Sequence, residues 1–66
     1  MTAWQPDAYD RQRASEAEII TARCPGWLAV YGYYTRRFWA YGGPDGKPLA
    51  ARSASELLGL MRAAEQ

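Results

Sequence analysis

The sequence predicts a small α+β domain built from a helix, a three-stranded antiparallel meander with a weak third strand, and a C-terminal helix. Helix-forming residues dominate both ends of the chain, and seven of its nine aromatic residues lie between positions 26 and 41. A glycine-rich turn at 42–48 separates that aromatic region from a shorter apolar run. Because the helices come from the two ends of one short chain, we expect both on one face of the sheet.

The first helix is expected within "DAYDRQRASEAEIITAR", and two starting points agree with the sequence. Ser15 and Glu18 have the spacing of a capping box, in which each side chain accepts from the other residue's backbone N–H. Alternatively, the helix begins at Pro6–Asp7 and Ser15 lies on its surface. It should end by Cys24, because Pro25 disfavours helical geometry at the preceding residue. The predicted apolar face is thin: Tyr9, Ala17, Ile19, Ile20 and Cys24. Residues 1–6, "MTAWQP", are expected to form a loose lead-in, with Trp4 able to dock onto the single domain.

Three strands should follow, at Gly26–Gly32, Arg36–Tyr41 and Leu49–Arg52. Tyr33-Tyr34-Thr35 marks the first bend, and "GGPDGKP" has the composition of a hairpin turn. In the last segment, Ser53 and Glu56 have the spacing of a second capping box. An apolar stripe at three- and four-residue spacing then predicts an amphipathic helix: Ala54, Leu57, Leu58, Met61 and Ala64.

Composition limits how this chain can be stabilised and what chemistry it can perform. A domain of this length buries only about 60% of the surface that its unfolded chain exposes. One cysteine cannot form an intramolecular disulfide, and the absence of histidine removes the usual zinc ligands and the usual catalytic base. We therefore expect no metal or other cofactor and no catalytic site. Oligomerisation is the leading alternative source of stability, and Cys24 is interpreted as a small apolar residue.

Charge and hydropathy favour a cytoplasmic protein that does not enter a membrane. The N-terminus lacks a basic-then-apolar signal pattern, and the longest apolar run, "WLAVY", is far shorter than the roughly 20 residues of a membrane span. The formal net charge of +1 does not demand a nucleic-acid partner. Seven of the eight basic residues are nevertheless arginines.

The aromatic segment is apolar on both of its expected faces. Alternation places Trp27, Ala29 and Tyr31 on one side of the first strand, with Leu28 and Val30 on the other. Two helices can cover one face only, so the second face should bind a homodimer partner or another bacterial protein. The strand register is left open. The residues predicted for this interface are Trp27, Tyr31, Trp39 and Tyr41, with Arg36 and Arg37 at its rim.

The same residue types allow an alternative prediction, binding of RNA or single-stranded nucleic acid. In that hypothesis Arg36 and Arg37 neutralise phosphates while aromatic side chains stack on bases. The expected stacking residues are Tyr31, Tyr33, Tyr34, Trp39 and Tyr41.

The segment "CPGWLAVYGYYTRRFWAY" resembles a pattern in short uncharacterised proteins of high-GC bacteria. In those proteins Pro-Gly-Trp precedes one strand, an Arg-aromatic-Trp-Ala run forms the next, and a Ser/Thr-x-x-Glu-Leu box opens the last helix, as at Ser53–Leu57 here. The resemblance covers Pro25–Met61. Some of these proteins accompany helix-turn-helix regulators, which implies a small regulatory accessory role. A weaker similarity to small toxins of double-stranded-RNA-binding topology does not imply nuclease activity, because their essential histidine is absent.

Overall fold

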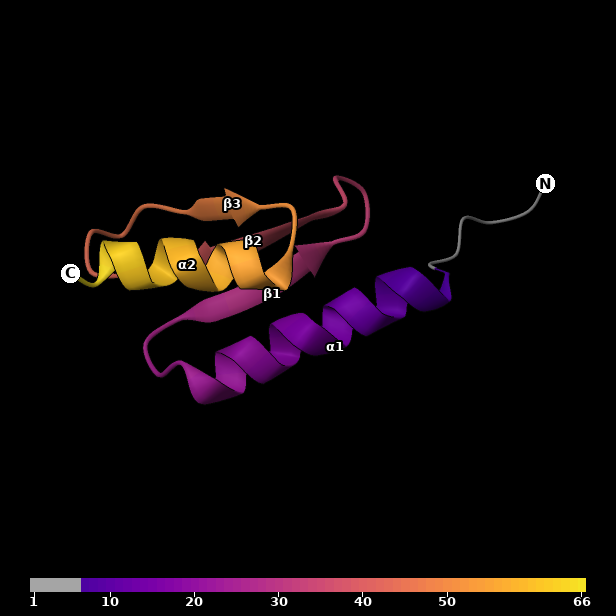
Figure 1. Cartoon of the computed structure of the whole chain (residues 1–66), viewed down its shortest axis with the longest axis horizontal. Helices are drawn as coiled ribbons and strands as arrows, with labels where there is room; N and C mark the ends of the chain where they lie inside the picture. The colour runs from indigo at the N-terminus through magenta and orange to yellow at the C-terminus, as the bar shows by residue number, and fades with distance from the viewer. Residues whose placement is uncertain (1–6) are drawn as a thin grey trace.

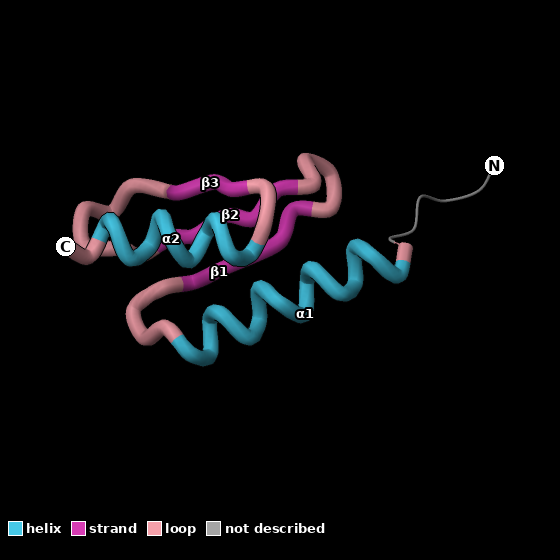
Figure 2. Tube along the Cα trace, in the orientation of Figure 1, coloured by secondary structure: helices cyan, strands magenta, loops and turns pink. Residues whose placement is uncertain are grey.

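The computed structural model describes residues 7–66 as two helices packed on a three-stranded sheet (Figure 1). The elements are α1 (Ala8–Arg23), β1 (Leu28–Gly32), β2 (Arg37–Tyr41), β3 (Leu49–Ala51) and α2 (Ala54–Ala64). The sheet has the order β1-β2-β3, and both neighbouring pairs are antiparallel (Figure 2). The predicted α+β class and element order are confirmed, with each strand slightly shorter than expected. The predicted lead-in and Trp4 lie outside the described residues.

Helix α1 begins at the earlier of its two predicted starting points. Asp7 is the N-cap, and its carboxylate accepts a hydrogen bond from the backbone N–H of Asp10 at 2.8 Å. The Asp10 carboxylate in turn accepts from the backbone N–H of Asp7 at 3.3 Å. This reciprocal box satisfies N–H groups that have no partner within the helix. Ser15 therefore lies inside the helix and does not begin it.

The buried stripe of α1 is narrower than predicted. Ala17 and Ile20 are buried and Cys24 is partly buried, but Tyr9 and Ile19 are exposed. The helix packs mainly against the single strand β1 and touches α2 more lightly. At 100° per residue, Ile19 lies about 160° from Ala17 and faces solvent, whereas Tyr9 lies within about 20° of Ile20 but roughly three turns earlier, in the first turn of the helix. The guanidinium of Arg13 instead covers the exposed ring of Tyr9, 4.0 Å from its centroid.

The predicted C-terminal helix and its apolar stripe are confirmed. Ser53 is the N-cap of α2 and accepts from the backbone N–H of Glu56 at 3.1 Å. The Glu56 carboxylate accepts from the backbone N–H of Arg52, one residue before the N-cap, so the second half of the predicted capping box is displaced by one residue. Leu57 and Met61 are fully buried, and the other stripe residues pack partly against the core.

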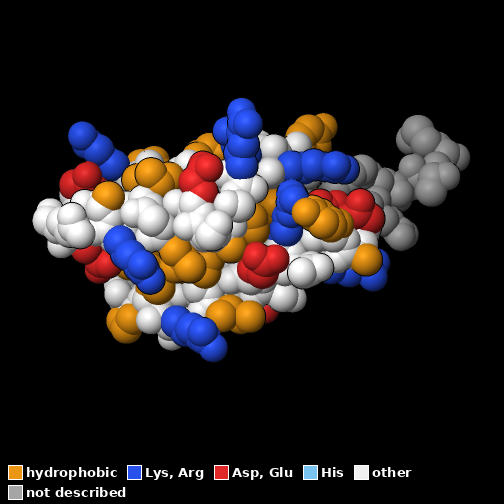
Figure 3. All heavy atoms as spheres, viewed as in Figure 1, with side chains coloured by type: hydrophobic (Ala, Val, Ile, Leu, Met, Phe, Trp, Pro, Cys, Tyr) orange, Lys and Arg blue, Asp and Glu red, His pale blue; other side chains and the backbone are white. Residues whose placement is uncertain are grey.

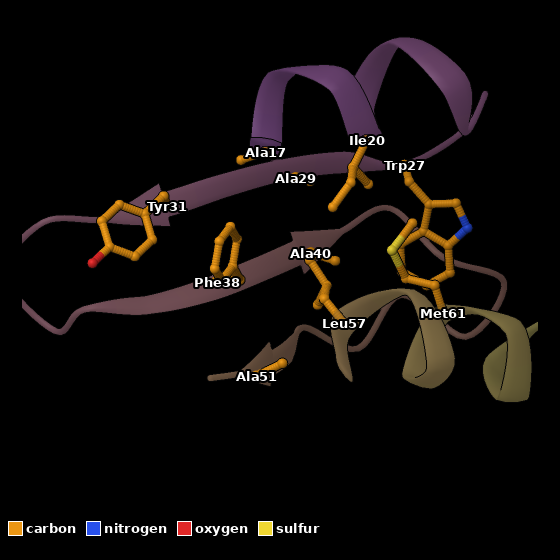
Figure 4. Close-up of a cluster of buried hydrophobic side chains, with 10 residues drawn as sticks. All are labelled: Ala17, Ile20, Trp27, Ala29, Tyr31, Phe38, Ala40, Ala51, Leu57 and Met61. Atoms are coloured by element: carbon orange, nitrogen blue, oxygen red, sulfur yellow. The ribbon is translucent and has the colours of Figure 1, made fainter. Parts of the chain in front are cut away.

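All core side chains lie between the sheet and the two helices (Figure 4). Tyr31 and Phe38 pack at one end of this layer, with ring centroids 5.1 Å apart. Trp27 and Met61 close the other end. The Trp27 ring lies so close to Gly43 that a Cβ there would be 2.7 Å from Cζ2. The core consists of Ala17, Ile20, Trp27, Ala29, Tyr31, Phe38, Ala40, Ala51, Leu57 and Met61.

Candidate functional site

The sheet face opposite the helices carries apolar side chains in contact with solvent. We call this surface the open face and define it by the residues that alternate with the core positions: Leu28, Val30 and Gly32 of β1, Arg37, Trp39 and Tyr41 of β2, and Ala50 of β3. Leu28 is 53% exposed, Tyr41 42% and Val30 37%. None of these positions holds an acidic residue. An antiparallel sheet with one solvated face normally has polar residues there, so this composition makes the open face the candidate binding surface.

The strand register arranges the open face in three rows. Leu28 lies opposite Tyr41 in the first row. Val30, Trp39 and Ala50 form the middle row. Gly32 and Arg37 form the third row, and Arg52 follows β3 at the same end of the sheet. Two apolar rows are thus followed by one basic row.

The helix side of the molecule has a different character. Figure 3 shows basic and acidic side chains spread over that side among apolar atoms. Mixed charge of this kind is typical of a solvated surface.

The structure separates the four aromatic residues that were predicted to share one interface. Trp39 and Tyr41 lie on the open face, whereas Trp27 and Tyr31 are buried at 6% and 7% exposure. The predicted grouping is therefore wrong for Trp27 and Tyr31. The reason is the register: Tyr31 pairs with Phe38, and this pair faces the helices. Leu28 and Val30 lie on the open face instead. Alternation predicted that these two residues share a face, but it did not predict which face that would be.

The two predicted rim arginines also occupy different places. Arg37 is exposed in the third row of the open face, whereas Arg36 lies in the β1–β2 loop. Arg36 has a φ of 57°, a left-handed conformation that costs a non-glycine residue about 1–2 kcal/mol. Its backbone N–H donates to the carbonyl of Gly32 at 2.7 Å, which closes the hairpin.

The predicted base-stacking residues do not form one surface. Tyr31 is in the core, and the ring of Tyr33 packs edge-on against it at 5.6 Å. Tyr34 is fully exposed at the tip of the loop. Trp39 and Tyr41 belong to the open face, on the strand that follows the loop.

Trp39 is held in place by the loop beside it. Its indole Nε1–H donates to the hydroxyl of Thr35 at 3.3 Å. A Cβ on Gly32 would lie 3.4 Å from the same nitrogen, so the indole leans toward the third row. Trp39 is thereby partly buried and oriented before any partner binds, which lowers the entropy that ordering it would cost on binding.

The β1 edge of the sheet is closed by a side chain of α1. The Thr21 hydroxyl accepts from the backbone N–H of Ala29 at 2.8 Å and lies 3.0 Å from the carbonyl oxygen of the same residue. Both backbone groups of Ala29 therefore point away from β2. In an antiparallel ladder such outward groups are a template for a further strand, and Thr21 occupies them.

The β3 edge also has few backbone groups available to pair with a further strand. Since the outward residue alternates along each strand, Ala50 is the β3 residue whose backbone groups point away from β2. Pro48, on one side, has no N–H. Arg52, on the other side, donates its N–H to Oε1 of Glu56 at 3.3 Å. With both edges obstructed, the open face is the part of the sheet best able to accept a partner.

One buried polar contact was not foreseen. Asp10 is only 3% exposed, and Oδ1 of its carboxylate accepts a hydrogen bond from the Tyr31 hydroxyl at 3.0 Å. No local pattern in the sequence predicts this contact. The contact joins the start of α1 to β1, 21 residues further along the chain.

Electrostatics link the β1–β2 loop to the same end of α1. The hydrogen bond from the backbone N–H of Asp10 lowers the pKa of Asp7, and the nearby positive charge of Arg36 lowers this pKa further. Arg36 is thus within electrostatic reach of the helix N-cap.

Protein-family models, curated proteins and solved structures were compared with this chain, and none matches it. Within residues 7–66, no helix is both long and apolar enough to span a bilayer. No group of three or more carboxylate or thiol side chains in the described part of the chain is arranged to hold a metal ion.

Proposed function

We propose that this protein is a small interaction module, with a regulatory accessory role, that binds another protein chain through its open face. The observation that carries the proposal is the pair of adjacent apolar rows on a sheet whose edges are obstructed. Covering Leu28, Val30 and Tyr41 removes apolar surface from water at roughly 25 cal/mol per Å². Trp39, which is oriented in advance, is of the residue type most enriched among interface hot spots.

A second candidate function, binding of single-stranded nucleic acid, rests on the β1–β2 loop. Tyr34 is fully exposed there, and two exposed arginines follow at positions 36 and 37. Stacking of a base on a tyrosine contributes about 1–3 kcal/mol. Two observations weigh against this candidate: Tyr31 is buried in the core, and the negative charge of Asp7 lies near Arg36.

A photo-crosslinking experiment distinguishes the two functions. A benzophenone amino acid is placed at position 50 on the open face, and at position 60 on the exposed side of α2 as the matched control. After irradiation in an extract of the native host, we expect protein adducts from position 50 that disappear in the Trp39→Ala background. Adducts that are removed by nuclease, or that form equally from position 60, would contradict the proposal.

A further inference from the structure

We infer that the chain bound to the open face is a second copy of this protein, related by a two-fold axis that runs along the middle row. This inference rests on the proposed function, because it names the partner of the same surface. It follows from the order of the three rows and from their charges.

The arginine row restricts how two open faces can meet. A two-fold axis parallel to the strands brings each row onto itself, so Arg37 would face Arg37 of the second copy. With no acidic residue on the open face, that contact would bury like charges together. An axis along the middle row exchanges the two outer rows and avoids this repulsion.

The exchanged rows complement one another. Rotation about the middle row places Arg37 over Tyr41 of the second copy, and a guanidinium over a tyrosine ring is a favourable pairing. The same rotation places Leu28, which is 53% exposed, over Gly32 of the second copy. The Trp39 indole lies over that glycine, with Nε1 and Cδ1 3.4 and 3.6 Å from the place a Gly32 Cβ would take, so Leu28 would meet the edge of the indole. Both contacts occur twice because the interface is isologous.

In this arrangement the middle row of one copy packs against the middle row of the other. Val30, Trp39 and Ala50 each face the identical residue, and the strands of the two sheets run antiparallel across the interface, within the roughly 30° of aligned sheet packing. The two sheets should lie about 10 Å apart. This spacing makes the arrangement testable with single cysteines.

The first measurement is the mass of the full chain by light scattering over a dilution series. We expect twice the chain mass of 7.4 kDa. Trp39→Ala should raise the dimer dissociation constant about tenfold or more. Arg37→Glu should also weaken the dimer and, because Arg37 is exposed, it serves as the second variant if Trp39→Ala fails to fold. Leu60→Ala, on the exposed side of α2, is the control and should leave the dissociation constant unchanged.

The second measurement locates the axis in a Cys24→Ala background with a bismaleimide that spans about 10 Å. Ala50→Cys should crosslink to its own copy, because it lies on the axis. Leu28→Cys should not crosslink, because Leu28 lies over Gly32 of the second copy. The two copies of residue 28 are therefore four residues, about 14 Å, apart along the strand direction. Crosslinking of Leu28→Cys but not Ala50→Cys would overturn the proposed axis.

The outcomes separate failure of this inference from failure of the proposed function. A monomer at every concentration, together with adducts from position 50 to a different protein, would overturn the second copy and leave the interaction module standing. A monomer without such adducts would overturn both. A dimer that is weakened by Leu60→Ala and not by Trp39→Ala would show that another surface mediates self-association.

Discussion

Replacing Tyr31 by phenylalanine tests whether the start of α1 is fastened to the sheet by a buried hydrogen bond. The substitution removes one hydroxyl and keeps the ring that packs against Phe38 and Tyr33. The carboxylate of Asp10, 3% exposed, then loses its donor from β1 and keeps the backbone N–H of Asp7. The change isolates the contribution of a single contact.

Its magnitude follows from the burial of the acceptor. A hydrogen bond to a charged group contributes about 1.5–3 kcal/mol, and here few water molecules can replace the lost donor. We expect Tyr31→Phe to lower the free energy of unfolding by that amount. For a domain of this size this corresponds to a fall in melting temperature of roughly 6–24 °C.

Urea denaturation followed by circular dichroism measures the effect. The slope of free energy against urea should stay unchanged, since the same surface is exposed on unfolding. Tyr34→Phe is the matched control, because its hydroxyl is fully exposed, and it should change stability by less than about 0.5 kcal/mol. Equal stabilities for the two variants would refute the role assigned to the Asp10–Tyr31 contact.

Three further predictions concern the fold. Gly43→Ala should lower the free energy of unfolding by about 1–3 kcal/mol, because its Cβ would overlap the Trp27 ring. Gly59→Ala meets no atom within 4 Å and should stabilise α2 by about 1 kcal/mol. Thermal melts of both variants check these two expectations. Thr21→Val keeps the side-chain shape and removes the hydroxyl at the β1 edge, so it should lower the free energy of unfolding by about 1–2 kcal/mol. It should also speed hydrogen exchange of the Ala29 amide, and an unchanged exchange rate would contradict the closure of that edge. Folding lowers the pKa of Asp7, so the stability it contributes is present above roughly pH 4 and is lost as the pH falls through the lowered value. An Asp7→Asn variant should therefore lose less stability on acidification than the parent protein in parallel urea titrations, and identical pH profiles would show that the Asp7 charge is not coupled to folding.

Local signals in the sequence determined the elements of this protein. The Ser53 N-cap, the glycine-rich turn and the end of α1 before Pro25 each depend on neighbours within a few residues, and each is found where expected. The predicted Glu56 half of the capping box binds Arg52 instead. Alternation in the strands likewise separated Leu28 and Val30 from Tyr31 before any pairing was known. These signals are readable because capping, turn geometry and side-chain alternation depend on neighbours along the chain.

The open face itself was decided only by tertiary structure. A shift of one residue in strand pairing moves every side chain to the opposite face, and no local signal in the aromatic segment specifies the Val30–Trp39 pairing. The burial of Asp10 against Tyr31 and the use of Thr21 to close the β1 edge depend on how α1 packs against β1. Alternation in the sequence predicted that one apolar face of the sheet would be left uncovered, and the open face is apolar over two of its three rows. Which aromatic residues form it was decided by register and helix packing, because both involve residues distant in the chain.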